Sequence, residues 1–230
     1  MIVGPALGVA IAGALTHGAF YPNSPLFGRV ISHLRTRGRL VALTFDDGPN
    51  PEATPAILDA LGARGIKAAF FILGRHAERW PELVRRTADE GHTICNHGYH
   101  HRKLHLKSPG YVRQDLELGT QAIVDACGVR PAFFRAPHGF RSPWVTAIAS
   151  SLGQRTVGWG RGVWDSAMPG VDVIAERTVR AAKPGAILLL HDGDGYDPLG
   201  DRRQTARAVP LLADRIRDAG FSFASLETAA

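Results

Sequence analysis

Short apolar runs alternate with longer amphipathic stretches from about residue 39 to the end of the chain. The runs have the length and composition of β-strands, and the stretches between them have the spacing of helices. Alternation of this kind is typical of parallel strands joined by helical crossovers. We therefore predict an α/β fold that forms a distorted, seven-stranded (β/α) barrel in a single domain, with a doubly wound open sheet as the alternative. The predicted strands are Leu40–Phe45, Ala68–Ile72, Thr93–Cys95, Ala132–Phe134, Arg155–Gly158, Ala186–Leu190 and Phe221–Ala224.

Signals for the starts and ends of helices fall between the predicted strands. Thr54, Ser108 and Ser142 each precede a proline, an arrangement that caps a helix and begins its first turn. Glycines follow the amphipathic stretches, where a left-handed residue terminates a helix. These glycines are Gly65, Gly91, Gly128, Gly153 and Gly220. Both signals predict helices as the connections between strands.

The first predicted strand ends abruptly in Asp46 and Asp47, and Gly48 and Pro49 follow. Two adjacent carboxylates at the end of a buried strand are costly unless each is paired, hydrogen-bonded or bound to a metal ion. Their side chains diverge because successive strand residues point to opposite faces, so the two acids can take different chemical roles. An ordinary Asp-Gly-Pro turn is the alternative.

Other polar side chains also follow predicted strands directly. The active site of a (β/α) barrel is assembled at the carboxyl ends of several strands, whereas ordinary surface charges would scatter over both ends. This placement predicts one site to which several strands contribute. The residues concerned are Asp46, Asp47, Asn96, His97, His101, Arg135, Asp165, His191 and Asp192.

His97 and His101 are four residues apart in a histidine-rich segment. On a helical turn, side chains at this spacing share a face, so both imidazoles could bind one metal ion. With one aspartate they would provide three ligands and leave positions open for water and substrate. His101 and His105 have the same spacing, but we favour His97 because it follows a strand directly.

Four short motifs follow one another along the chain: Thr44–Pro49, His97–His101, Arg135–Gly139 and Leu188–Asp192. In this order they resemble the successive motifs of the polysaccharide deacetylases, the NodB-homology family that is also called carbohydrate esterase family 4. The resemblance extends from about residue 38 to the C-terminus. It implies a deacetylase domain over residues 38–230, preceded by an N-terminal lead over residues 1–37.

The resemblance implies one divalent metal ion held by Asp47, His97 and His101. Zinc is our first expectation, and cobalt, nickel or manganese suit the same ligands. Such a metal ion activates water and polarises an acetyl carbonyl. The resemblance also implies that Asp46 is the general base and His191 the general acid.

Two further residues would support this chemistry. Arg135 is the arginine of the third motif and would keep Asp46 ionised, whereas Asp165 would favour the protonated form of His191. A structural ion pair is the alternative for both. The tetrahedral oxyanion would be held by the metal ion and by a backbone N–H near His138.

The sequence departs from the family pattern at several positions. Gly98 stands where the family usually has Ser or Thr, and His138 stands where Tyr or Phe is commoner. The motif around Asp165 is the weakest match, because Gly162 replaces an Asp and Ser166 replaces a Trp that packs near the acetyl group. We therefore expect an active enzyme whose substrate pocket is altered.

Trp164 or Trp159 would fill the space of the missing tryptophan, although either could equally belong to the core. We predict that the residues contacting the substrate include His138, Trp164 and Leu189.

Composition adds little to this interpretation. The net charge of +6 over 230 residues is modest; a solvated basic face explains it more simply than an anionic partner. No basic motif interleaved with aromatic residues indicates nucleic-acid binding. Cys95 and Cys127 stand alone, which excludes a cysteine-rich metal site and leaves one disulfide open.

The N-terminal stretch from Ile2 to Leu15 is nearly all apolar, and Ala12–Ala14 resembles a small-residue cleavage site. The stretch is shorter than the roughly 20 residues that a membrane span needs. We interpret it as the remnant of a signal or anchor, which places the protein outside the cytoplasm and at the cell envelope. A cytoplasmic protein whose N-terminal segment is buried against the barrel is the alternative.

These observations predict a hydrolase that removes N-acetyl groups from a peptidoglycan-like or chitin-like polysaccharide or glycolipid containing N-acetylglucosamine. The alternatives are an esterase of O-acetyl groups, as on acetylated xylan, or another amide hydrolase of the same fold. An inactive carbohydrate-binding protein would lack a ligand or the base, and neither is missing. A glycoside hydrolase needs two carboxylates that flank the scissile bond, and adjacent acids accompanied by histidines do not suit that reaction.

Overall fold

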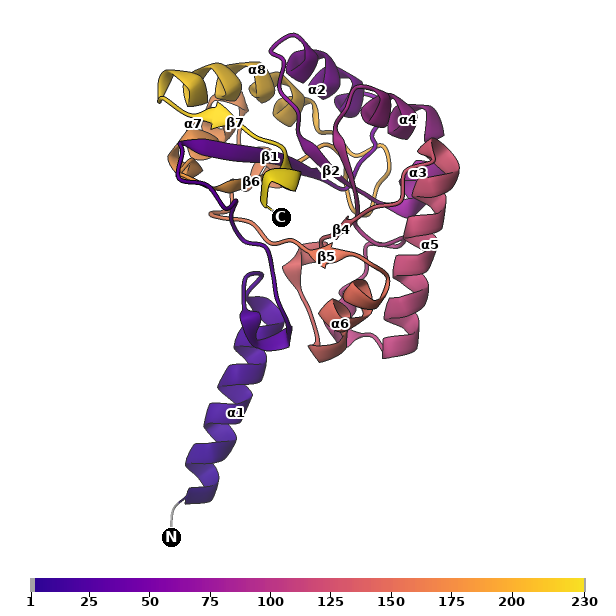
Figure 1. Ribbon diagram of the computed structural model, residues 1–230, viewed down its shortest axis with the longest axis vertical. Helices are drawn as coiled ribbons and strands as arrows, with labels where there is room; N and C mark the ends of the chain where they lie inside the picture. Colours follow the sequence, from indigo (N-terminus) through magenta and orange to yellow (C-terminus); the bar gives the residue numbers. More distant parts are fainter. Residues whose placement is uncertain (1–2, 230) are drawn as a thin grey trace.

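Seven parallel strands form one curled sheet in the computed structural model, which describes residues 3–229 (Figure 1). The strand order is β5-β4-β3-β2-β1-β6, and β7 pairs with the first residues of β1. The curled sheet forms part of a barrel, and the chain has a single domain. This confirms the predicted distorted (β/α) barrel. The strands are β1 (Leu40–Asp46), β2 (Ala69–Ile72), β3 (Thr93–Asn96), β4 (Phe133–Phe134), β5 (Arg155–Thr156), β6 (Ile187–His191) and β7 (Ser222–Phe223).

The central strand β1 is buried on both faces, which explains its nearly continuous apolar sequence. Val41, Leu43 and Phe45 belong to the core between the sheet and the outer helices, whereas Ala42 belongs to a second core inside the curl. Because side chains alternate along a strand, Asp46 shares the inner face with Ala42. The strand therefore carries its last carboxylate into the interior of the barrel.

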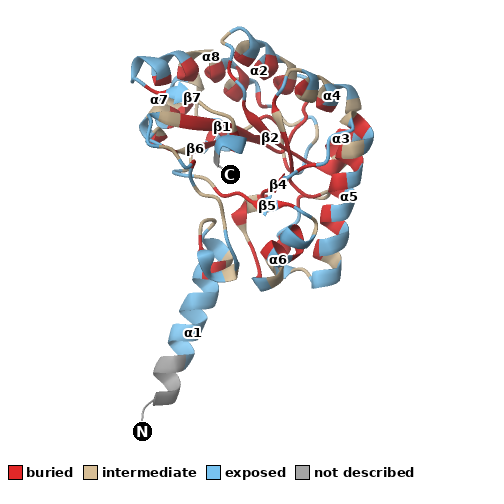
Figure 2. Cartoon of the chain, in the orientation of Figure 1, coloured by how far each residue is buried: buried red, intermediate tan, exposed pale blue. Residues whose placement is uncertain are grey.

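Helices connect most of the strands and cover the outer face of the sheet (Figures 1 and 2). The glycines predicted to end helices all have positive φ angles, from 62° at Gly65 to 78° at Gly153 and Gly220, so the predicted left-handed terminations are confirmed. The helices are α1 (Val3–Phe20), α2 (Ala53–Gly62), α3 (Gly74–Arg79), α4 (Pro81–Asp89), α5 (Pro109–Cys127), α6 (Pro143–Ser151), α7 (Val171–Ala181) and α8 (Arg203–Asp218).

The predicted helix starts are confirmed at Ser108 and Ser142 but not at Thr54, and of the two serines only Ser108 caps its helix through the hydroxyl. Helix α2 begins at Ala53, and the side-chain oxygen of Asn50 accepts hydrogen bonds from the first amides of this helix. Thr54 lies inside the helix, where its hydroxyl donates to the buried Oδ2 of Asp192 at 2.6 Å. The Thr-Pro signal failed because the hydroxyl serves a tertiary contact.

Part of the N-terminal lead is built into the barrel. Ile31 bridges to Val157 beyond β5, and His33 bridges to Ala186 before β6, so this segment lies between the two edge strands of the curled sheet. Leu34 is 1% exposed and belongs to the core inside the curl. Residues 31–34 of the lead predicted over residues 1–37 therefore pack against the barrel.

Helix α1 projects away from this body, and its side chains from Gly8 to His17 are exposed (Figure 2). The alternative of an N-terminal segment buried against the barrel is therefore wrong for this stretch. Within residues 3–229, no helix combines the length and the hydropathy that a membrane-spanning helix needs. The interpretation as a signal or anchor remnant stays a prediction. Both cysteines are free, with Cys95 buried in β3.

Candidate active site

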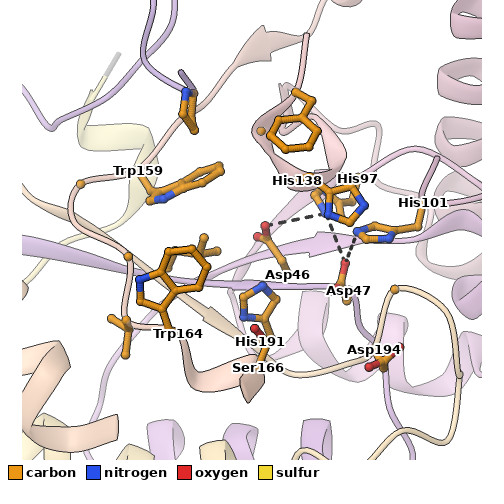
Figure 3. A pocket seen from close by; sticks show the side chains of 18 of the residues that line it. Asp46, Asp47, His97, His101, His138, Trp159, Trp164, Ser166, His191 and Asp194 are labelled. Atoms are coloured by element: carbon orange, nitrogen blue, oxygen red, sulfur yellow. Dashed lines mark ion pairs between the residues drawn. The ribbon is translucent and has the colours of Figure 1, made fainter. Parts of the chain in front are cut away.

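Asp47, His97 and His101 converge at the carboxyl end of the sheet, as Figure 3 shows. Asp47 Oδ1 lies 3.3 Å from Nε2 of His97 and 3.1 Å from Nε2 of His101. All three side chains are buried. Four ligands arranged tetrahedrally around a zinc ion at about 2.1 Å lie roughly 3.4 Å from one another, so this spacing suits a common metal ion.

The hydrogen bonds around these residues also fit a metal ion. Nδ1 of His97 lies 2.8 Å from the carbonyl oxygen of Arg135 and donates to it, which leaves the lone pair of Nε2 directed at Asp47. Metal-binding histidines usually have such a partner on their other nitrogen. Asp47 Oδ1 is buried without a hydrogen-bond partner among the described residues. Burial would raise the pKa of Asp47, but the two imidazoles hold it well below its usual value.

His97 and His101 meet through a loop, so the predicted helical turn is wrong. Positive φ angles at Gly98 (80°) and His101 (57°) turn the chain back on itself. Asp115 of α5 holds this loop, because its carboxylate accepts hydrogen bonds from the amides of Tyr99 and His100. A Cβ at position 98 would lie 2.5 Å from this carboxylate. Asp115 therefore braces the loop and leaves no room for a serine or threonine at position 98.

Asp46 lies beside the metal-ligand group and is held by Arg135. Nη1 of Arg135 donates to Asp46 Oδ1 at 2.6 Å and to the hydroxyl of Thr44 at 2.9 Å, and Nη2 donates to the carbonyl of Gly158. The guanidinium is fully buried and stacks on the ring of Phe71 at 4.0 Å. The other oxygen, Asp46 Oδ2, lies 3.7 Å from Nε2 of His97 on the metal-ligand side.

His191 ends β6 directly beside Asp46, because the two residues are paired in the register of neighbouring strands. Its Nδ1 lies 2.9 Å from Asp165 Oδ1, and its backbone amide donates to Oδ2 of the same carboxylate. Thr205 of α8 also donates to Asp165 Oδ2. Burial would lower the pKa of His191, but the Asp165 carboxylate outweighs it and raises the pKa to about 9. His191 is therefore protonated at neutral pH.

One cavity of about 610 Å³ contains these reactive groups. Arg135 and Asp165 lie behind its wall and contact Asp46 and His191. Asn96 and Asp192, which the sequence also placed in this site, do not line the cavity: Asn96 donates to the carbonyl of Leu116, and Asp192 accepts from Thr54. Trp164 is 70% exposed and is therefore not a core residue. Trp159 and Ser166 also line the cavity. The predicted site residues that line the cavity are Asp46, Asp47, His97, His101, His138, Trp164, Leu189 and His191.

Sequence reasoning missed two parts of this cavity. The first is the segment Asp194–Tyr196 after β6, in which Gly195 packs so closely on His101 that a Cβ would lie 2.1 Å from Nδ1. Gly193 and Gly195, which lie within four residues of the end of β6, are the signal that could have found it. The second is the segment Phe20–Asn23 at the end of α1, for which the sequence carries no such signal.

The chain is similar to several known proteins. Residues 33–157 match the family model described as polysaccharide deacetylase. The chain is 39% identical to a chitooligosaccharide deacetylase from Bradyrhizobium sp. (strain ANU 289) over 192 residues. This alignment covers 80% of this chain and 87% of the relative. It is 33% identical to a peptidoglycan-N-acetylglucosamine deacetylase from Bacillus cereus over 201 residues. That alignment covers 86% of this chain and 92% of the relative.

A solved structure shows the same similarity in three dimensions. It is that of the Bc1960 peptidoglycan N-acetylglucosamine deacetylase in complex with 4-naphthalen-1-yl-N-oxidanyl-benzamide, with a TM-score of 0.80 and 30% identity. The superposition covers 86% of this chain and 91% of that chain. The similarity therefore extends over most of both molecules.

Proposed function

Because the chain belongs to the polysaccharide deacetylase family, we propose that it hydrolyses N-acetyl groups on a glycan containing N-acetylglucosamine. Water attacks the acetyl carbon, the C–N bond breaks, and acetate and a free sugar amine are released. The observation that carries the proposal is the convergence of three units on one cavity. These units are Asp47–His97–His101, Asp46–Arg135 and His191–Asp165.

Asp47, His97 and His101 would hold one divalent metal ion, and zinc is the first candidate because its sites combine imidazole and carboxylate ligands. When bound, such an ion supplies Lewis-acid polarisation of the acetyl carbonyl and a lowered pKa for water. The unpartnered Oδ1 of Asp47 and the bond from His97 Nδ1 to the Arg135 carbonyl support this assignment.

Asp46 acts as the general base. Arg135 binds Oδ1 and fixes the orientation of the carboxylate, so Oδ2 on the metal-ligand side accepts the proton of the attacking water. The buried guanidinium also compensates the charge of a carboxylate that would otherwise be isolated in the interior. Arg135 is thus a positioning residue for the base.

His191 acts as the general acid. Asp165 binds Nδ1, which leaves Nε2 to donate a proton to the departing amine nitrogen. A raised pKa of about 9 keeps His191 protonated at the start of the reaction. Thr205 and the His191 amide both donate to Asp165 Oδ2 and hold this carboxylate in place.

We assign a contact with the oxyanion to the backbone amide of His138. The amides that follow it, of Gly139 and Phe140, already donate to the carbonyls of Ala136 and Pro137. An amide hydrogen bond to the tetrahedral oxyanion would be stronger in the transition state than in the ground state. Trp164 and Leu189 on the cavity wall would contact the substrate.

We also propose that the substrate is a glycan of the cell envelope, outside the cytoplasm. The support is that relatives from Bacillus cereus and Listeria monocytogenes carry the name peptidoglycan-N-acetylglucosamine deacetylase.

Acetate release from a panel of substrates tests the proposal. The panel contains chitin oligosaccharides, peptidoglycan fragments and acetylated xylan, and the enzyme is supplied with divalent metal. We expect the wild type to release acetate from at least one of the two N-acetylated substrates and the Asp46→Asn variant to be at least about 100-fold slower. Equal release by both proteins would refute the role of Asp46, and release from acetylated xylan alone would favour an O-acetyl esterase.

A further inference from the structure

The aromatic side chains that are at least half exposed share one location. Among the residues whose side chains the structure describes, Phe20, Tyr21, Trp164 and Tyr196 have exposed fractions of 50%, 51%, 70% and 59%. All four line the cavity that contains the reactive groups. Exposed apolar surface that gathers at one groove is typical of a ligand-binding site. Trp164 and Tyr196 lie in loops that follow strands, whereas Phe20 and Tyr21 come from the N-terminal lead.

A chain of ring contacts leads from the metal-ligand group to this N-terminal pair. His101 contacts His138, with ring centroids 4.6 Å apart, and His138 contacts Phe140 at 5.7 Å. Phe140 in turn packs edge-on against Phe20 at 5.1 Å. Phe20 therefore lies two ring contacts beyond His138 in this chain.

The segment that carries Phe20 and Tyr21 is firmly attached to the barrel. Arg141 is 1% exposed, and its Nη2 donates to the carbonyls of Tyr21, Pro22 and Ser24 at 3.4, 3.3 and 2.8 Å. The side-chain Nδ2 of Asn23 donates to the carbonyl of Trp159 at 2.7 Å. Tyr21 takes part in this anchor through its backbone carbonyl, so its side chain can be changed without removing the anchor.

We propose that Phe20 and Tyr21 form a subsite for a second sugar of the glycan, next to the sugar that loses its acetyl group. This inference rests on the proposed function. The apolar C–H faces of a hexosamine ring pack well on aromatic rings, while its hydroxyl and acetamido groups stay in contact with water at the cavity mouth. The ligand is a β-linked N-acetylhexosamine unit, which both chitin oligosaccharides and peptidoglycan contain.

The subsite predicts that the enzyme prefers longer chains and that Tyr21 contributes to this preference. The measured quantity is the ratio of kcat/KM on the chitin pentamer to kcat/KM on the monomer N-acetylglucosamine, which has no second sugar. We expect Tyr21→Ala to lower the ratio roughly threefold to tenfold, the size of one aromatic stacking contact, and Tyr21→Phe to keep it. Leu26→Ala is the matched control, because Leu26 is 51% exposed in the same segment but does not line this cavity. An equal ratio in Tyr21→Ala and Leu26→Ala overturns the subsite.

A binding measurement separates this inference from the proposed function. Titration calorimetry measures the affinity of the Asp46→Asn variant for the pentamer and for a peptidoglycan fragment, with and without Tyr21→Ala. If Tyr21→Ala lowers the affinity for either ligand threefold to tenfold, the result supports the subsite and identifies that glycan. This holds even if the wild type releases no acetate. In that case only the proposed function fails. No loss with either ligand, or no binding at all, overturns the subsite.

Discussion

The contact between Asp165 and His191 makes a sharp prediction about the pH dependence of catalysis. The Asp165→Asn variant keeps the shape of the side chain but removes the charge that outweighs the burial of His191. In the wild type the pKa of His191 is raised from 6.5 to about 9, which corresponds to about 3 kcal/mol of preference for the protonated form. Without the carboxylate, the largest contribution that opposes burial is lost, and the pKa of His191 falls from about 9.

The consequence for activity follows from the protonated fraction of the general acid. At pH 8 a histidine with a pKa of about 9 is about 90% protonated, whereas one with the ordinary pKa of 6.5 is only about 3% protonated. We therefore expect kcat at pH 8 to fall by up to about 30-fold in Asp165→Asn. The alkaline limb of the kcat profile should move from near pH 9 to lower pH.

The assay is acetate release measured between pH 5 and pH 10 on the preferred glycan, with Asp218→Asn as the control because Asp218 is an exposed aspartate at the end of α8. A profile of Asp165→Asn whose alkaline limb coincides with that of the wild type would refute the reasoning. The same raised pKa stabilises the fold. Because the folded pKa exceeds the unfolded value, this stabilisation is fully present below pH 6.5 and is lost as the pH rises through about 9.

Two further substitutions test how the site is held together. Gly195→Ala should weaken metal affinity about 10- to 100-fold, because the added Cβ would displace His101. Gly110→Ala is the control, because Gly110 has open space around it. Equal metal affinities of the two variants, measured by calorimetry, would contradict this prediction. Arg135→Met should lower the free energy of unfolding by about 3–5 kcal/mol, because it leaves the buried Asp46 carboxylate without its partner; a loss below about 1 kcal/mol in urea denaturation would contradict it.

Much of the fold was predictable because it depends on local patterns. Each predicted strand lies within two residues of an observed one, since most of the apolar runs are buried in the sheet, as those of β1, β2, β3 and β6 are. The left-handed glycines were also predictable, because glycine takes positive φ angles at little cost. Thr54 shows the limit of such signals, since its hydroxyl bonds to Asp192, which is 138 positions away in the sequence.

The predictable part of the candidate site consists of reactive side chains that stand at or directly after strand ends, because these ends meet at the same edge of the sheet. The geometry of the histidine loop was not predictable, because Asp115 acts from a separate helix and nothing near Gly98 in the sequence indicates it. The contribution of Phe20 and Tyr21 was equally hidden, since it depends on Arg141 binding backbone carbonyls about 120 positions away. Long-range contacts of this kind leave no periodicity in the sequence.

The central claim is that Asp47, His97 and His101 hold one divalent metal ion that the reaction requires. The direct measurement is a titration of the metal-depleted protein with zinc, which gives the number of zinc ions bound per chain and the final metal content. Asp218→Ala is the control. The account predicts one bound ion per chain in the wild type and the control, none in Asp47→Ala, and acetate release only after zinc is added. Retention of one tightly bound ion by a folded Asp47→Ala variant would contradict it.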